Sequence, residues 1–143
     1  MAEIFGAGLL TSICGYWPDF HDAEITRLCL ERAHPYERGP TLEIDVHTFE
    51  ITPEVDKGGH YVLRHHVLVT LRFEGAQELV LEDFNNQNAI ASLTFAPIDT
   101  AAFPEPAFQV SIDGAHGLAG GFRCREVTVI AVRPWEITSE ASA

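Results

Sequence analysis

Apolar and polar residues alternate along much of this chain. In residues 42–47, Leu42, Ile44 and Val46 occupy every second position. A period of two is typical of a β-strand that buries one face and exposes the other. The same kind of pattern occurs at residues 23–32, 67–73, 79–81, 93–95, 108–112 and 127–132. It is less regular at residues 23–32, and residues 127–132 are rich in β-branched side chains, which favour strands. The pattern therefore predicts about seven strands.

Turn-forming residues separate the predicted strands. Gly and Pro predict connections at residues 38–40, 52–59, 74–76, 97–106 and 113–121, of which 74–76 is short enough for a hairpin turn. Helical signals are limited to residues 5–14 and to one turn at 85–90 with an Asn cap. We therefore expect a mainly β fold, α+β at most, with an antiparallel sheet or sandwich of about seven strands and one short N-terminal helix.

The length and the cysteines limit the class of protein. At 143 residues the chain suits a single globular domain, residues 1–143, with a frayed end at residues 139–143. Its three cysteines, Cys14, Cys29 and Cys124, include no close pair, so we expect reduced thiols in a cytoplasmic protein. The first apolar stretch is short and broken by glycines, which predicts neither a signal peptide nor a membrane span.

Acidic residues dominate the charge. The chain holds 21 Asp and Glu against 9 Lys and Arg, a formal net charge of -12 at pH 7. Such a chain repels phosphate groups, so we exclude nucleic acid and anionic membranes as partners and expect a cationic partner. No Lys or Arg lies between Arg72 and Arg123, whereas several acidic residues do. That stretch either projects one electronegative face or forms an ordinary solvated surface.

The sequence WPDFHDAEI at residues 17–25 concentrates side chains that carry chemistry. In one interpretation His21 is a general base oriented by Asp22 or Glu24, or a metal ligand beside them. Adjacent residues of an extended segment point to opposite faces, however, so His21 and Asp22 would not share one site. We favour a structural role, in which the two aromatic residues plug one end of the core and Asp19 or Asp22 caps a turn into the first strand.

No other pattern points to catalysis or to a metal. A zinc site needs three or four converging ligands, and the histidines show no HxH or HExxH spacing. His21, His65 and Asp83 could still meet in space, although nothing local predicts it. Cys29 lies in an apolar strand pattern, where a thiol is usually inert, and the chain has no GxSxG nucleophile motif. We expect no catalytic residue, no metal site and no cofactor.

Four amide side chains follow Phe84 in the sequence FNNQN. Such amides can read bases or sugars through paired hydrogen bonds, or they can satisfy backbone groups at a tight turn. We favour the turn, because Phe84 ends one predicted strand and Ile90 begins another element.

These two motifs suggest a family. Residues 17–25 resemble the W-P-x-F-H-D-A-E opening of a family of bacterial immunity proteins, number fifty among the immunity proteins of polymorphic-toxin systems. FNNQN at residues 84–88 looks like the second landmark of that family, and residues 69–75 and 121–127 add weaker similarity. The similarity extends from about residue 10 to residue 132. We expect the motif residues to be structural: Trp17, Phe20, His21, Asp22, Glu24, Phe84, Asn85 and Asn88.

The resemblance implies a binding protein rather than an enzyme. Members of such a family sequester a toxin secreted between competing bacteria, and a basic toxin would complement this acidic chain. Phe49 is a candidate aromatic anchor, because it shares the polar face of its strand with charged residues. Trp17, Tyr61 and Trp135 are further candidates. The predicted contact surface combines that face with the following loop: Glu43, Asp45, His47, Phe49, Glu50, Glu54 and Asp56.

Two alternatives stay open at this point. The chain could be a small-ligand-binding or metal-dependent enzyme domain that uses the cluster His21, Asp22 and Glu24. It could also be a structural domain that forms a homodimer through an exposed strand edge. The position of the cluster discriminates between a fold signature, if it is buried, and a site, if it lies exposed in a cleft.

Overall fold

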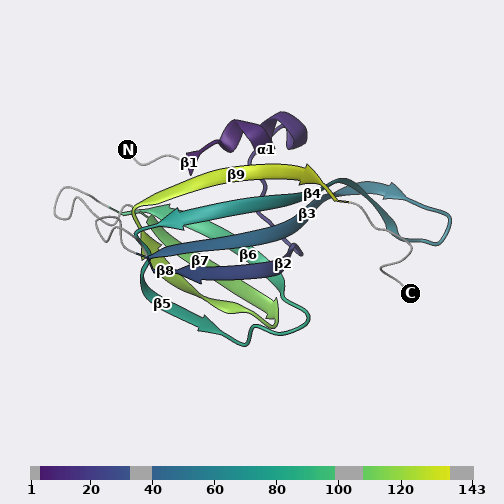
Figure 1. The fold of residues 1–143 in the computed structure, drawn as a ribbon. Helices are drawn as coiled ribbons and strands as arrows, with labels where there is room; N and C mark the ends of the chain where they lie inside the picture. The colour runs from purple at the N-terminus through teal and green to yellow at the C-terminus, as the bar shows by residue number, and fades with distance from the viewer. Residues whose placement is uncertain (1–3, 33–39, 99–107, 136–143) are drawn as a thin grey trace.

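A computed structural model describes residues 4–32, 40–98 and 108–135, without the side chains of residues 50–53 and 61–65 (Figure 1). These described residues form one helix and nine strands: β1 (Ile4–Phe5), α1 (Ala7–Cys14), β2 (Glu24–Glu31), β3 (Thr41–Val55), β4 (Tyr61–Glu74), β5 (Gln77–Glu82), β6 (Ala89–Pro97), β7 (Phe108–His116), β8 (Ala119–Cys124) and β9 (Glu126–Pro134). The predicted mainly β fold with one short N-terminal helix is confirmed, but the strands number nine rather than about seven. The end predicted to fray, residues 139–143, and most of the crossing predicted at 97–106 lie outside the described residues.

The sequence pattern missed the strands β1 and β8. Residues 113–121, predicted as a connection, are mostly strand, because β7 continues to His116 and β8 begins at Ala119. Glycines obscured this strand, since they carry no side chain that could show an alternation. They are needed there for close packing: at Gly120, whose φ is 151°, a Cβ atom would overlap with the carbonyl oxygen of Val80 on β5.

One other predicted connection and the predicted helical turn also differ from the structure. β3 continues through the expected loop as far as Val55, which pairs with Tyr61. The register shifts between Ile51 and Val55, an irregularity that accommodates a proline in a strand. Residues 85–88 form an irregular loop instead of a helical turn. The Asn side chains accept hydrogen bonds from loop N–H groups there, which replaces the bonding that a helix would provide.

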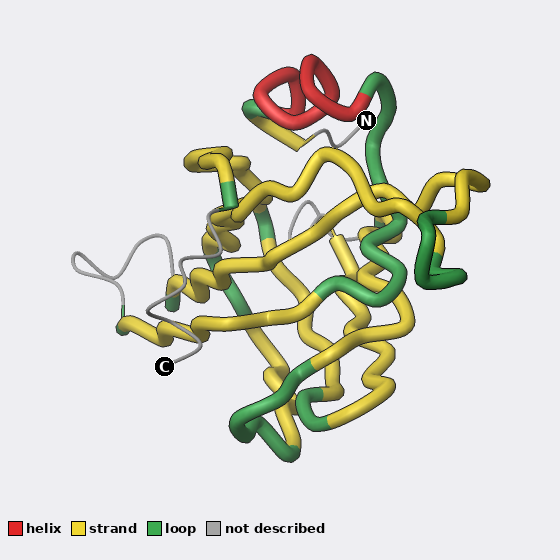
Figure 2. Tube along the Cα trace, turned by 90° about the vertical axis from the view of Figure 1, so that its right-hand side faces the viewer, coloured by secondary structure: helices red, strands yellow, loops and turns green. Residues whose placement is uncertain are grey.

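All nine strands belong to one sheet, in the order β1-β9-β4-β3-β2-β6-β7-β8-β5, and only β1 and β9 are parallel. β2 and β6 pair only where Glu24 faces Ala89. The sheet parts at this seam, and its halves form two layers of a sandwich (Figures 1 and 2). The first layer holds β9, β4, β3 and β2, and the second holds β6, β7, β8 and β5. Across the interior, the ring centroids of Phe73 on β4 and Phe122 on β8 are 4.9 Å apart.

The core fills the space between the layers. Every second residue of the strands points into it, as the alternation predicts, and these residues include Leu42, Ile44, Val46, Val69, Leu71, Phe73, Val110, Ile112 and Phe122. α1 lies beside β9 (Figure 1). It buries Leu10 against the core. The helix sits close because Gly6, with φ 75°, approaches the carbonyl oxygen of Val129. Among the described residues, no helix has the length and apolar character needed to cross a membrane.

Candidate functional site

The first sequence motif fills the seam between the two layers. The N–H of Asp22 donates to the carbonyl of Ile90 at 2.9 Å, and the N–H of Ile90 donates to that of Ala23 at 2.9 Å. Two residues beyond Ala23, the N–H of Ile25 donates to the carbonyl of Asn88 at 3.0 Å. The motif backbone therefore extends the single β2–β6 pair and joins the layers, which supports a structural role for this segment.

The aromatic residues of the motif close one end of the core. Phe20 is 1% exposed, and its ring centroid lies 5.7 Å from that of the half-buried Trp17. Trp17 also contacts Phe95 of β6 edge to face. The turn before the strand is capped by Asp19, whose Oδ1 accepts the N–H of His21 at 2.9 Å. Of the two aspartates proposed as caps, it is thus Asp19 that accepts this bond.

His21 and Asp22 do not point to opposite faces, as an extended segment would require. Phe20 and Asp22 have φ values of 63° and 64°, so the chain turns at these residues. The turn brings His21 Nε2 to 3.5 Å from Asp22 Oδ2, with both side chains more than half exposed. His21 Nδ1 lies 3.0 Å from the carbonyl oxygen of Ala91 and donates to it, because a carbonyl only accepts.

The remaining member of that cluster, Glu24, begins β2 beside His47 of β3. The side chain of His65 lies outside the described part of the structure. Among the described side chains, no group of three or more His, Cys, Asp or Glu is placed to hold a metal ion.

The second motif fixes the same seam from the other side. Asn88 is 3% exposed and makes four hydrogen bonds. Its Nδ2 donates to the carbonyls of Ile25 and Asn85, while its Oδ1 accepts the N–H groups of Asn85 and Leu118. Asn88 thus satisfies backbone groups of β2, of its own loop and of the turn before β8. Phe84, by contrast, is 46% exposed.

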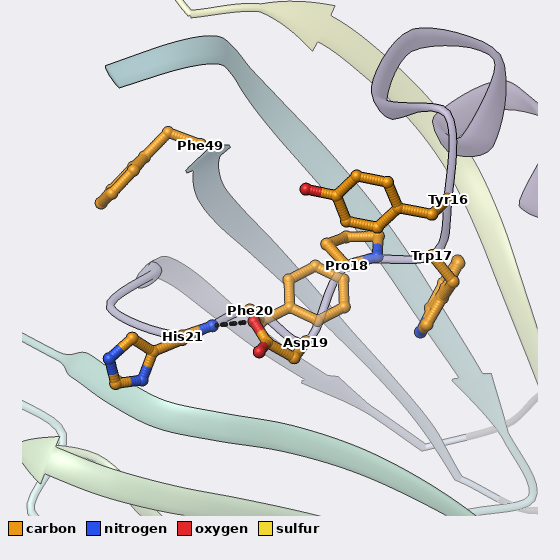
Figure 3. Close-up of a pocket in the computed structure, with 7 residues that line it drawn as sticks. All are labelled: Tyr16, Trp17, Pro18, Asp19, Phe20, His21 and Phe49. Atoms are coloured by element: carbon orange, nitrogen blue, oxygen red, sulfur yellow. Dashed lines mark hydrogen bonds between the residues drawn. The ribbon is translucent and has the colours of Figure 1, made fainter. Parts of the chain in front are cut away.

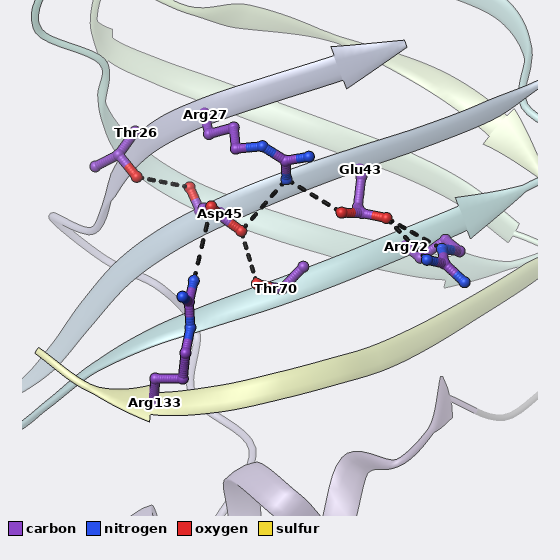
Figure 4. A network of polar contacts seen from close by, with 7 residues as sticks. All are labelled: Thr26, Arg27, Glu43, Asp45, Thr70, Arg72 and Arg133. Carbon is purple, nitrogen blue, oxygen red and sulfur yellow. Dashed lines mark hydrogen bonds and ion pairs between the residues drawn. The ribbon is translucent and has the colours of Figure 1, made fainter. Parts of the chain in front are cut away.

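Asp45, on the outward face of β3, is almost buried by its neighbours (Figure 4). Thr70 Oγ1 on β4 donates to its Oδ1 at 2.6 Å. The guanidinium groups of Arg27 and Arg133 reach its two oxygens at 3.6 and 3.9 Å. The negative charge of Asp45 is therefore balanced within the sheet.

Glu43 is paired in the same way, one step further along β3 (Figure 4). Arg27 Nη1 donates to its Oε1 at 3.1 Å, and Nε and Nη2 of Arg72 both donate to its Oε2 at 3.1 Å. Burial raises the pKa of Glu43, but the hydrogen bonds from Arg27 and Arg72 outweigh it and lower the pKa below its usual value. We call Arg27, Glu43, Asp45, Thr70, Arg72 and Arg133 the charge network.

Aromatic rings occupy the other end of this face. The imidazole of His47 stacks on Trp135, with centroids 3.9 Å apart, and its Nε2 lies 3.1 Å from Nδ1 of His66. The ring of Phe49 lies within 5.7 Å of both histidines. Burial, and secondarily the nearby His66, lowers the pKa of His47. His47, Phe49, His66 and Trp135 form what we call the aromatic cluster.

Phe49 also borders a pocket of about 400 Å³ beside the first motif (Figure 3). Figure 3 shows Phe49 across the pocket from His21 and Asp19, with Tyr16 on a third side. The full lining comprises Tyr16, Trp17, Pro18, Asp19, Phe20, His21 and Phe49. The aromatic cluster and this pocket are therefore continuous through one shared side chain.

Beyond Phe49, β3 and β4 continue as a hairpin arm that projects from the sandwich (Figure 1). At its tip, Asp56 Oδ1 accepts the N–H groups of Gly58 and His60. Glu54, Val55 and Asp56 are exposed there. The side chains of Glu50 and Tyr61 lie outside the described residues.

The sequence placed the polar side chains of β3 and β4 on the outward faces of their strands but did not pair them. Glu43 faces Arg72, and Asp45 faces Thr70, because of the β3–β4 register. Arg27, Arg133 and Tyr16 carried no signal in the sequence, since they come from segments that meet only in the folded chain.

Comparisons with known proteins identify the family of this chain. Neither the search of curated proteins nor that of solved structures returned a match. The family model described as Immunity protein 50 matches residues 6–135, which include both motifs, the charge network and the aromatic cluster. The chain therefore belongs to the immunity protein 50 family.

Proposed function

We propose that this protein binds a cognate bacterial toxin and neutralises it by forming a stoichiometric complex. The observation that carries the proposal is the family match over residues 6–135. In this proposal the protein acts by covering the toxin and catalyses no reaction. It acts in the cytoplasm, where its cysteine thiols would stay reduced.

We place the centre of the toxin-binding surface at the aromatic cluster. Aromatic side chains that become fully desolvated carry most of the energy of many protein interfaces, and a polar rim surrounds them. Phe49 is the proposed anchor, because it touches both the aromatic cluster and the pocket. Glu50, Glu54 and Asp56 of the arm form the proposed acidic rim. Glu43 and Asp45 form the opposite boundary, where their charges are already paired.

The charge of the chain supports a basic partner. A net charge of -12 attracts a cationic protein before the two surfaces touch and raises its association rate at low ionic strength. Nucleic acid and anionic membranes are repelled by the same field. A second copy of this chain is repelled as well, so we propose a heteromeric complex over a homodimer.

The test is binding to the protein encoded by an adjacent toxin-like gene. The purified full chain and that protein are mixed at 50 and 300 mM NaCl, and the complex is measured by calorimetry and by size exclusion with light scattering. We expect one immunity chain per toxin, with weaker binding at the higher salt concentration. Loss of toxin activity on mixing completes the test. Absence of any complex at the lower salt concentration would contradict the proposal.

A small-ligand site is the second candidate function. His21 and Asp22 lie 3.5 Å apart, and His21 lines the pocket of about 400 Å³, which lies within the usual range of ligand sites. If this candidate is right, the purified protein turns over or retains a small molecule, and His21→Ala abolishes that property. The toxin proposal expects no such effect of His21→Ala.

A further inference from the structure

The pocket beside the first motif combines aromatic surface with a carboxylate. Its lining includes Tyr16, Trp17 and Phe49, and Asp19 lies on the side facing Phe49 (Figure 3). No Lys or Arg belongs to this described lining. A second carboxylate, that of Asp22, lies 3.5 Å from the imidazole of His21, which belongs to the lining.

This lining suits a planar cation. The faces of aromatic rings carry partial negative charge and attract a cation that lies over them. A guanidinium group also stacks on such rings and donates paired hydrogen bonds to a carboxylate, which an ammonium group does less well. The Asp19 carboxylate is held in place, because its Oδ1 accepts the N–H of His21 at 2.9 Å. A preorganised anion among aromatic rings favours binding of a cation over binding of a neutral group of the same shape.

We propose that this pocket receives an arginine side chain of the partner, with the guanidinium group on Asp19 and against the rings of Tyr16 and Phe49. The proposal rests on the proposed function, since it names the partner chemistry that this end of the surface selects. It fits the charge of the chain, which favours a basic partner. It also explains why Phe49 would contribute twice, once to the aromatic cluster and once to the wall of the pocket.

The first experiment needs no toxin. The isotope-labelled full chain is titrated with Nα-acetyl-arginine amide and, separately, with Nα-acetyl-citrulline amide, in which a neutral urea replaces the guanidinium group. We expect saturable chemical-shift changes with the arginine compound, largest at the rings of Tyr16 and Phe49, and much smaller changes with citrulline. Equal responses to both compounds, or no response to arginine, would overturn the proposal.

A matched pair of variants tests the role of the charge. Asp19→Asn keeps an oxygen that can accept the His21 N–H but removes the carboxylate. We expect this variant to raise the Kd for the arginine compound about fivefold. Glu82→Gln removes one charge from the end of β5, outside the pocket, and should leave the titration unchanged. Equal affinities for Asp19→Asn and wild type would overturn the role assigned to Asp19.

The same variants separate this proposal from the proposed function. If wild type and Asp19→Asn bind the toxin equally well, the pocket assignment fails while the toxin proposal stands. If wild type binds no toxin, the proposed function fails, and the titration with the arginine compound still decides whether the pocket takes a guanidinium group.

Discussion

The two ends of the outward face of β3 show the same alternation but are built differently. At one end, Glu43 and Asp45 are bridged by three arginines and a threonine from β2, β4 and β9. At the other end, His47 and Phe49 pack only against other rings in their described contacts, and Phe49 borders an open pocket. At one end of the strand the polar groups are thus paired within the sheet, while the other end presents apolar surface.

The contrast shows that a polar strand face is not by itself an acidic surface. Cross-strand neighbours decide whether a carboxylate is available to a partner, because side chains on adjacent strands lie about 5 Å apart. The charge network therefore contributes to the stability of the first layer. The aromatic cluster borders solvent, so its rings contribute less to the stability of the fold. It is therefore the better candidate for burial by another protein.

The largest expected effect is on stability, at the charge network. Asp45→Ala should lower the free energy of unfolding by about 3 kcal/mol, because it leaves the buried Thr70 hydroxyl and the Arg133 guanidinium group without this partner and leaves Arg27 with Glu43 alone. Asp113→Ala is the control, since exposed Asp113 accepts a hydroxyl hydrogen bond from Ser92 at 2.8 Å. It should lose less than about 1 kcal/mol. Denaturant unfolding measures both, and similar losses would remove the distinction between buried and exposed pairs.

Phe49→Ala should have the opposite profile. We expect a loss of about 2 kcal/mol in toxin affinity, or about thirtyfold in Kd, as for a central aromatic anchor. Its free energy of unfolding should change by about 1 kcal/mol or less, because Phe49 lies outside the core. Calorimetry with the toxin and denaturant unfolding measure the two effects. Phe84→Ala, which removes an exposed ring outside the aromatic cluster, is the control. An equal loss of affinity in both variants would count against the aromatic cluster.

The two ends should also respond to different pH ranges. The pKa of His47 is below 6.5 in the folded state, so the unfolded chain binds the proton more readily. The contribution of His47 is therefore complete above pH 6.5 and decreases as the pH falls through 6.5 towards the folded pKa. His47→Gln should flatten the pH dependence of the free energy of unfolding in this range. If the free energy of unfolding of His47→Gln falls as steeply between pH 7 and 5 as that of the wild type, His47 is not the source of this pH dependence.

Glu43 should act at lower pH and by a smaller amount. Its folded pKa lies below the ordinary value of 4.5, so its contribution is present above pH 4.5 and is lost as the pH falls through the folded pKa. Glu43→Gln should lower the free energy of unfolding at pH 7 by about 0.5–1 kcal/mol, because the pair is partly exposed. The loss should shrink in 1 M NaCl. Comparison of urea unfolding at low and high salt checks this, and a loss that does not depend on salt would argue for packing instead of charge.

Much of the fold and part of the motif roles followed from local sequence. Alternation identified the inward residues of β3 and β4, and the burial of Phe20 agrees with the expected aromatic plug. Local reasoning failed where backbone geometry departs from a regular element. The positive φ angles of Phe20 and Asp22 bring His21 and Asp22 together, and the glycines of β8 hide a strand. Asn88 was expected at a turn, yet its bonds to β2 and to the turn before β8 depend on distant segments.

The sequence by itself determined the strand-rich class of this protein, the faces of its main strands and its family, because these depend on residues close together in the chain. Only the tertiary structure decided which charges are paired, which rings meet and where the pocket lies. Those features depend on strand register and on the closure of two layers over one core, which bring Arg27, Arg133 and Trp135 next to β3. Distant segments meet there because burying the core fixes one arrangement of the sheet, and the outward side chains take the neighbours that this arrangement provides.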